Sequence, residues 1–291
     1  MTHVQGMLYA LATFFLWVIV DTGMKIGGMA NVTPFLIVGI FGAVGVMGTV
    51  GAALAKRKLS LLVPHNGRGL ALIALCSFAI NAVNVVALKH LPLTVFYVAV
   101  FTAPLAIAAL SASLKHEKLG GFKILCLIAG FGGVVLAIAP RLVAGGEAIG
   151  YLAAAASVAC FAVYTVTIRK LSATDTPESI QFAVALFCAI GGFSCALLQR
   201  HSLEIDMHML VILATSAAIN IVANFLYNYA LKHTTSTNVA QLHYTQIIWG
   251  AIIGFALWHE LPTWNIVTGA VVIIGAGIIV ARLARKEQVM P

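Results

Sequence analysis

The chain is divided into apolar stretches, each close to the roughly 20 residues that an α-helix needs to cross a bilayer. Short polar connections separate them. Inside hydrocarbon every backbone N–H and C=O must be satisfied internally, which an α-helix does within one segment. The sequence therefore predicts an all-α integral membrane protein with ten transmembrane helices. The predicted spans are 4–24, 33–54, 69–89, 91–113, 121–139, 147–168, 178–198, 208–231, 235–257 and 264–283.

The charged residues are few and unevenly placed. Only 9% of the 291 residues are charged and 61% are hydrophobic, whereas about a quarter of an ordinary soluble domain is charged. With a cytoplasmic N-terminus, thirteen of the 17 Lys and Arg residues fall on the cytoplasmic side. This bias predicts a multi-pass protein of the inner (cytoplasmic) membrane with both termini in the cytoplasm. It also accounts for the formal charge of +8, so a nucleic-acid partner is not expected.

The two halves of the chain repeat each other. The tetrapeptide Ala87–His90 recurs as Ala230–His233, and the dipeptide His116–Glu117 recurs as His259–Glu260, both at an offset of 143 residues. We therefore expect a first repeat over 1–144 and a second over 145–291, each with five helices. An odd number of crossings inverts the second copy in the bilayer. Inverted repeats of this kind are typical of secondary transporters, whose substrate site lies where the repeats meet.

The repeated segments also resemble a known family. Ala87–Glu117 and Ala230–Glu260, and within the second the stretches Tyr244–Trp249 and Gly254–Glu260, are similar to the EamA family of the drug/metabolite transporter (DMT) superfamily. The resemblance covers nearly the whole chain. It implies that helices 1, 3, 4, 6, 8 and 9 line a central cavity. It also implies a small-molecule substrate, which in that family ranges over amino acids, nucleotide-like metabolites, vitamins and cationic drugs.

Ionisable and amide side chains inside the predicted spans are candidates for function, because a charge at the bilayer centre costs about 3 kcal/mol or more. Asp21 lies one turn before Lys25, so it either pairs with Lys25 at the membrane boundary or serves a substrate or proton. Asn220, Asn224 and Asn228 share one helix face, where they either face a cavity or hydrogen-bond neighbouring helices.

The predicted ninth helix has a polar centre. His243 in that centre either packs, binds substrate or titrates near neutral pH. Aromatic residues in the spans either pack or stack on a planar or cationic solute. Pro104 inside the fourth span is expected to break that helix. The predicted substrate-binding residues are Trp17, Asp21, Asn81, Asn84, Tyr97, Phe101, Tyr164, Asn220, Asn224, His243, Tyr244 and Gln246.

No catalytic residue, metal site or cofactor is predicted. His116–Glu117 and His259–Glu260 lack metal-ligand spacing and are expected to orient helix ends. A phosphate-binding loop of the ATPase type is absent from the sequence, so any driving force comes from gradients or exchange. The expected function is transport of a small amphipathic metabolite by alternating access, with amino acid export first. A planar nucleoside-like, S-adenosylmethionine-like or flavin-like solute and a simple channel are the alternatives, and the pattern specifies no oligomeric state.

Overall fold

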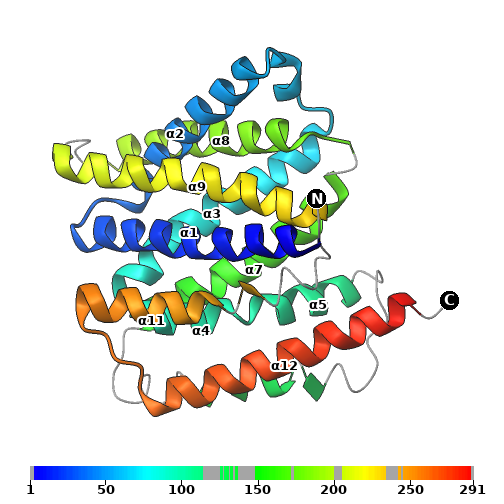
Figure 1. Cartoon of the computed structure of the whole chain (residues 1–291). Helices are drawn as coiled ribbons and strands as arrows, with labels where there is room; N and C mark the ends of the chain where they lie inside the picture. The colour runs from blue at the N-terminus through cyan, green and yellow to red at the C-terminus, as the bar shows by residue number, and fades with distance from the viewer. Residues whose placement is uncertain are drawn as a thin grey trace.

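Long helices running side by side make up the described part of the chain (Figure 1). The computed structural model describes residues 3–113, 125–126, 128–130, 132–133, 135–136, 148–171, 174–199, 205–233, 242–243 and 245–289. The helices are α1 (His3–Met29), α2 (Pro34–Ala55), the 3₁₀ turn η1 (Leu59–Leu62), α3 (Gly67–His90), α4 (Leu93–Val100), α5 (Ala103–Ser113), α7 (Ala148–Leu171), α8 (Pro177–Leu198), α9 (Met207–His233), α11 (Thr245–Trp258) and α12 (Trp264–Val289).

Six of these helices are long and apolar enough to cross a membrane: Gln5–Met29, Pro34–Ala55, Gly67–His90, Ala148–Ile168, Pro177–Leu198 and Met207–Tyr227. They match the first, second, third, sixth, seventh and eighth predicted spans. Three further apolar helices are shorter, namely Leu93–Ile107, Thr245–Trp258 and Trp264–Ala276. The predicted fifth span and the boundary between 144 and 145 fall largely outside the described residues.

Two helices begin with the same local device in the two halves. Thr33 caps α2 by accepting a hydrogen bond from the Phe35 N–H at 3.2 Å, and Thr176 caps α8 by accepting from the Ser179 N–H at 3.1 Å. A proline follows each threonine, where its fixed φ suits the first helical turn. Both helices then run for 22 residues. The two copies thus share their local start signal as well as their length.

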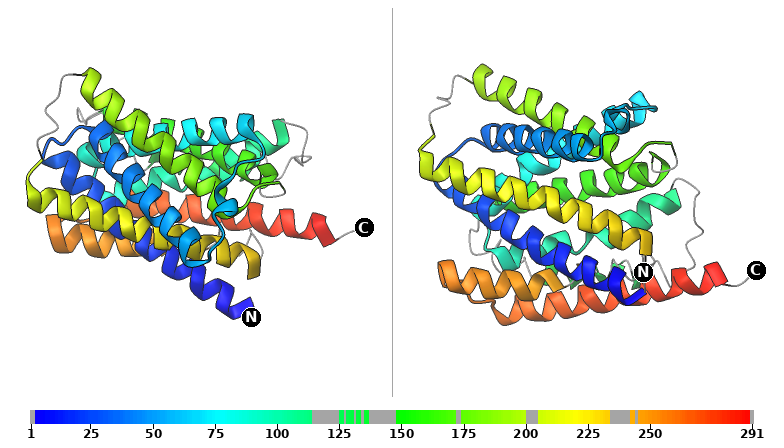
Figure 2. Two further views of the ribbon diagram at one scale, coloured as in Figure 1. Left: turned by 90° about the horizontal axis from the view of Figure 1, so that it is seen from above. Right: turned by 45° about the horizontal axis from the view of Figure 1, so that its top comes forward.

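The helices pair as a two-fold arrangement of the halves requires. Helix α1 packs along α9, and α3 packs along α7. Exchanging the two halves turns the first pair into the second, because α1 corresponds to α7 and α3 to α9. Helices α2 and α8, which correspond to each other, pack together. Figure 2 shows the N- and C-terminal ends of the described chain at one end of the bundle.

Glycines allow the close crossing of α2 and α8. A Cβ at Gly42 would lie 2.2 Å from the backbone nitrogen of Ala189. A Cβ at Gly192 would lie 2.4 Å from the backbone nitrogen of Gly39. Small residues of this kind let membrane helices approach until their backbones touch. This contact fixes one half of the molecule against the other.

The predicted fourth span is broken, as Pro104 led us to expect. Phe101 and Thr102 form a turn between α4 and α5. A proline at position 104 has no N–H to donate to the carbonyl of Val100, and α4 ends at Val100. Thr102 Oγ1 donates to the Ala99 carbonyl at 2.7 Å.

The second half repeats this hydroxyl bond. Thr245 Oγ1 donates to the Leu242 carbonyl, also at 2.7 Å and 143 residues further along the chain. The corresponding position to Pro104 is Ile247, so the proline itself is not repeated. The turn between α4 and α5 is therefore followed by a proline, with its fixed φ and missing N–H, that the second half does not have at the corresponding position.

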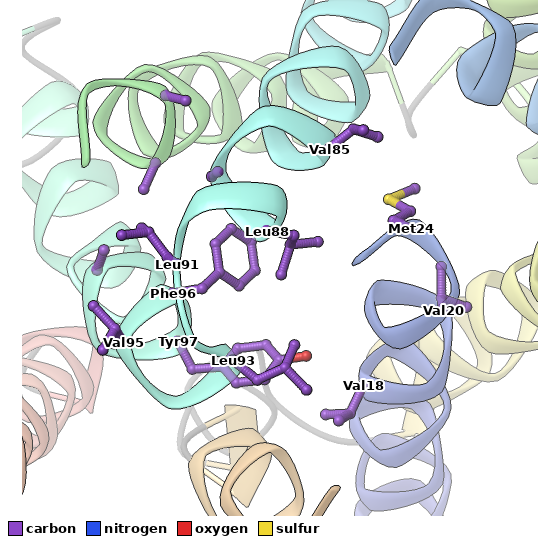
Figure 3. Close-up of a cluster of buried hydrophobic side chains, with 14 of the residues drawn as sticks. Val18, Val20, Met24, Val85, Leu88, Leu91, Leu93, Val95, Phe96 and Tyr97 are labelled. Atoms are coloured by element: carbon purple, nitrogen blue, oxygen red, sulfur yellow. The ribbon is translucent and has the colours of Figure 1, made fainter. Parts of the chain in front are cut away.

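A buried apolar cluster joins α1, α3 and α4 (Figure 3). Leu88 and Leu93 have no exposed surface, and Phe96 is 2% exposed. Figure 3 shows Val18 and Met24 of α1 facing this cluster. The cluster positions Tyr97, the residue from which the candidate site is built.

Candidate functional site

Helices α1, α4 and α11 are far apart in the sequence but meet in the structure. Helix α11 packs against both α1 and α4. Six side chains from these helices and their flanking residues lie in one continuous row of contacts, which we call the junction. Its members are Phe14, Trp17, Asp21, Tyr97, Phe101 and His243.

The polar contact of the junction joins α1 to α4. The Tyr97 hydroxyl donates to Asp21 Oδ2 at 2.8 Å. Tyr97 is only 1% exposed, whereas Asp21 keeps part of its surface accessible. Gly250 of α11 lies against the Tyr97 ring, since a Cβ there would lie 2.4 Å from it. The carboxylate is thus held by a donor that cannot move away without displacing α11.

Aromatic rings complete the junction. Tyr97 stacks on Phe101 with ring centroids 6.3 Å apart, and Phe101 meets the His243 ring edge-on at 5.5 Å. His243 lies 4.8 Å from Phe14, and Phe14 contacts Trp17 at 5.6 Å. Trp17 is one helical turn from Asp21, so both occupy one face of α1.

A buried amide adjoins the junction. Gln246 is 2% exposed and lies one helical turn after His243. Its Oε1 atom is buried without a hydrogen-bond partner among the described residues. A buried polar atom without a partner costs about 1–3 kcal/mol. The site is therefore short of hydrogen-bond donors at this point.

Lys25 does not pair with Asp21, one of the two roles considered for that aspartate. Its ammonium group forms a salt bridge with Glu260 and donates to the Leu91 carbonyl at 3.0 Å. The same nitrogen lies 4.7 Å above the Trp258 ring. Asp21 and Lys25 thus lie one turn apart on α1 but bind different neighbours. The reason is that α11 ends beside Lys25, which brings Glu260 within reach of it.

Glu260 links three segments at this end of the bundle. One carboxylate oxygen binds Lys25, and the other accepts the Leu93 N–H at 2.8 Å. Leu93 is the first residue of α4, so the expectation that Glu260 orients a helix end agrees with its contacts. A cavity of about 260 Å³ adjoins this network; it is lined by Pro92, Thr94, Val95, Trp258, His259, Glu260, Leu261, Pro262 and Ile266.

The other predicted amides lie on α3 and on α9. Asn81 Nδ2 donates to the Ser77 carbonyl at 2.8 Å. At the repeat-equivalent place, Asn224 Nδ2 is 3.5 Å from Asn220 Oδ1. Asn84 Oδ1 is buried without a partner among the described residues. The described contacts of Asn81 and Asn224 are each made within one helix, so these contacts do not join one helix to another.

Tyr164 of α7 packs against the buried cluster that includes Ile73 of α3 and Val184 of α8. It stacks on Phe161, with ring centroids 6.4 Å apart. Tyr227 of α9 packs 5.2 Å from Trp17 of the junction. Tyr244 and the side chain of Asn228 lie outside the described residues.

At the opposite end of the bundle, the connection after α2 meets the start of α8. Lys56 Nζ lies 2.6 Å from Glu178 Oε1, and Asp175 Oδ1 accepts the His65 N–H at 2.7 Å. Burial would raise the pKa of Asp175, but hydrogen bonds from the His65 backbone and the Thr174 hydroxyl, among others, hold it below its usual value. These contacts join the two halves.

Several of these residues were not predicted. Phe14 and Tyr227 carry no signal in a single sequence, because most aromatics in apolar helices only pack. The Lys25–Glu260 bridge spans 235 positions, which helical periodicity does not reach. The recurrence of Glu260 as Glu117 was the one available indication.

Comparisons with known proteins place the chain. The model of the EamA-like transporter family matches residues 4–139 and 148–282. One crystal structure is 21% identical, with a TM-score of 0.69 over 97% of this chain and 98% of that chain, and so shows the same fold. None of the curated proteins matches. Since two family matches together cover most of the sequence, the chain belongs to the EamA-like transporter family, within the drug/metabolite transporter superfamily, and is a multi-pass membrane transporter and not an enzyme.

Proposed function

We propose that the protein is a secondary transporter that moves a small amphipathic metabolite across the cytoplasmic membrane by alternating access. The observation that carries this proposal is the helix pairing between the halves, in which the contact of α1 with α9 is matched by the contact of α7 with α3. Two similar halves joined in this way have two related arrangements available. Each arrangement opens a central site to one side of the membrane.

The closed end of the bundle supports this mechanism. Lys25, Glu260 and the start of α4 are tied together beside the junction. Solute that reaches the junction from this end must first separate these groups. Under the proposed orientation, with both termini in the cytoplasm, this is the outer end.

The lining of the junction supports an amphipathic solute. Aromatic rings supply apolar area, and Asp21 and Gln246 supply polar atoms. A small number of placed polar groups in an aromatic wall is typical of small-molecule sites. Amino acid export is the first candidate activity, because an amino acid combines an apolar side chain with charged groups.

A planar nucleoside-like, S-adenosylmethionine-like or flavin-like solute is the second candidate. The stacked pair Tyr97–Phe101 and the neighbouring ring of Trp17 favour it, since flat rings pack well against aromatic faces. A channel belongs to a different class and predicts flux that does not saturate. Counterflow, in which unlabelled solute inside accelerates labelled uptake, requires a carrier.

The test is uptake into proteoliposomes that contain the purified full-length chain. A labelled panel of amino acids, nucleosides and vitamins is supplied with and without a pH gradient. We expect saturable, exchange-stimulated flux of one class. Gln246→Ala should reduce it at least tenfold, whereas Gln199→Ala, at the exposed end of α8, should leave it unchanged.

Unsaturable flux would assign the protein to the channels. Saturable flux that is the same in Gln246→Ala and the unmodified protein would keep the transporter and remove the junction from its substrate site. Flux equal to that of empty liposomes across the panel would contradict an amphipathic metabolite of these classes.

A further inference from the structure

We infer that the junction binds its solute through a cationic nitrogen, so that the transported molecule carries an ammonium or related group that is paired with Asp21. This inference rests on the proposed transport function and adds a substrate class to it. Three features of the described residues carry it.

The first feature is that the carboxyl group of Asp21 has no cationic partner among the described residues. Its only described hydrogen bond comes from the neutral Tyr97 hydroxyl. Lys25, the cation one turn away, is already bound to Glu260 and to a backbone carbonyl. Among the described residues no cation pairs with Asp21. A carboxylate within a spanning helix is costly without a partner, and a functional partner is the default expectation.

The second feature is a surplus of acceptors. Gln246 Oε1 is buried without a donor among the described residues, and Asp21 Oδ1 has no described donor. Ammonium nitrogens carry only donors. An ammonium group on the solute would therefore supply the donor that Asp21 lacks, and a further N–H or O–H of the solute would supply the donor that Gln246 lacks. An anionic solute would add further acceptors to a site that already has too many.

The third feature is the aromatic wall. Trp17 lies one turn from Asp21 on the same face of α1, and the Phe14 ring contacts it. The chain uses the same combination for a cation of its own, because Lys25 is held between the Glu260 carboxylate and the face of Trp258 at 4.7 Å. Asp21 and Trp17 repeat this combination of carboxylate and indole without a lysine. A cation over an aromatic face gains about 0.5–2 kcal/mol.

The test measures binding to the full-length protein in nanodiscs. The probes are two matched pairs, phenethylamine with phenethyl alcohol and hexylamine with hexanol, which differ in charge but hardly in shape. We expect the amines to bind at least tenfold more tightly than their alcohols. In Asp21→Asn this preference should disappear, because the amide keeps the shape and loses the charge.

Two further variants control for damage to the fold. Asp21→Glu keeps the charge and should keep the preference for amines. Asp206→Asn makes the same chemical change at an exposed position before α9 and should leave binding unaltered. Thermal unfolding of each variant shows whether it is folded.

The inference is overturned if neither amine binds more tightly than its alcohol, or if Asp21→Asn keeps the preference. It is also overturned if amine binding is the same in both proteins while Asp21→Asn abolishes only flux driven by a pH gradient, because Asp21 then holds a proton. Saturable transport of a neutral solute that persists in Asp21→Asn would reject the cationic substrate and leave the transporter intact.

Discussion

The burial of a charged side chain decides how much stability the protein loses when the partner of that charge is removed. Lys25 is almost fully buried and its ammonium is compensated by Glu260. Lys56, at the other end of the bundle, is paired with Glu178, but its side chain is 48% exposed. Water can replace the lost carboxylate at Lys56 and not at Lys25.

We therefore expect Glu260→Gln to destabilise the protein by about 3 kcal/mol, since removing one partner of a buried pair leaves the other charge uncompensated. Glu178→Gln, the same change beside an exposed lysine, should cost less than about 1 kcal/mol. Thermal unfolding of the detergent-solubilised variants gives both values. The double change Lys25→Met with Glu260→Gln should recover part of the loss. Equal destabilisation by the two single changes would show that Lys25 is hydrated.

At the scale of elements, the contact between α2 and α8 depends on the absence of side chains. Gly42 faces the backbone of Ala189, whereas a methyl group at Gly51, two and a half turns further along α2, would meet no neighbouring atom within 4 Å. Replacing each of these glycines by alanine therefore separates the effect of packing on stability from the effect of helix propensity.

Gly42→Ala should lower the stability of the protein by about 1–3 kcal/mol, because the added methyl overpacks a backbone contact. Gly51→Ala should be neutral or stabilising by up to about 1 kcal/mol, since alanine is the better helix former. Resistance to unfolding in increasing dodecyl sulfate compares the two. If Gly42→Ala is as stable as Gly51→Ala, α2 and α8 are free to shift apart.

For the whole molecule, the distribution of basic residues predicts which end faces the cytoplasm. Asn265, near the start of α12, and Lys58, after α2, are both exposed. The start of α12 and the end of α2 lie at opposite ends of the bundle (Figure 1). In whole cells Asn265→Cys should react with a membrane-impermeant maleimide, and Lys58→Cys should react only after permeabilisation. The unmodified chain is the background, because its cysteines lie within helices. The reverse pattern would invert the proposed orientation.

The sequence predicts the helices and the duplication better than it predicts the junction. Hydropathy predicts the six long spanning helices directly, and the repeated Ala-Leu-Lys-His and His-Glu segments indicate the two halves that the family model matches. Polarity or aromaticity within the spans marks six residues of this site as candidates from the sequence: Trp17, Asp21, Tyr97, Phe101, His243 and Gln246. Their contacts were not predicted, because the side chain that meets Asp21 is 76 positions away. A single sequence indicates which residues are neighbours along one helix, but it does not indicate which residues of different helices are in contact.

Pro104 is present in one copy of the repeat and replaced by Ile247 in the other. In the proposed alternating-access cycle, two conformations that exchange the roles of the halves are consequently not equivalent, since only the first half has a proline at this place and lacks the backbone donor. We therefore expect the two conformations to differ in free energy and the half-cycles to have unequal rates. The apparent affinity for solute should then differ between the two faces of the membrane even when the solute's own gradient is zero.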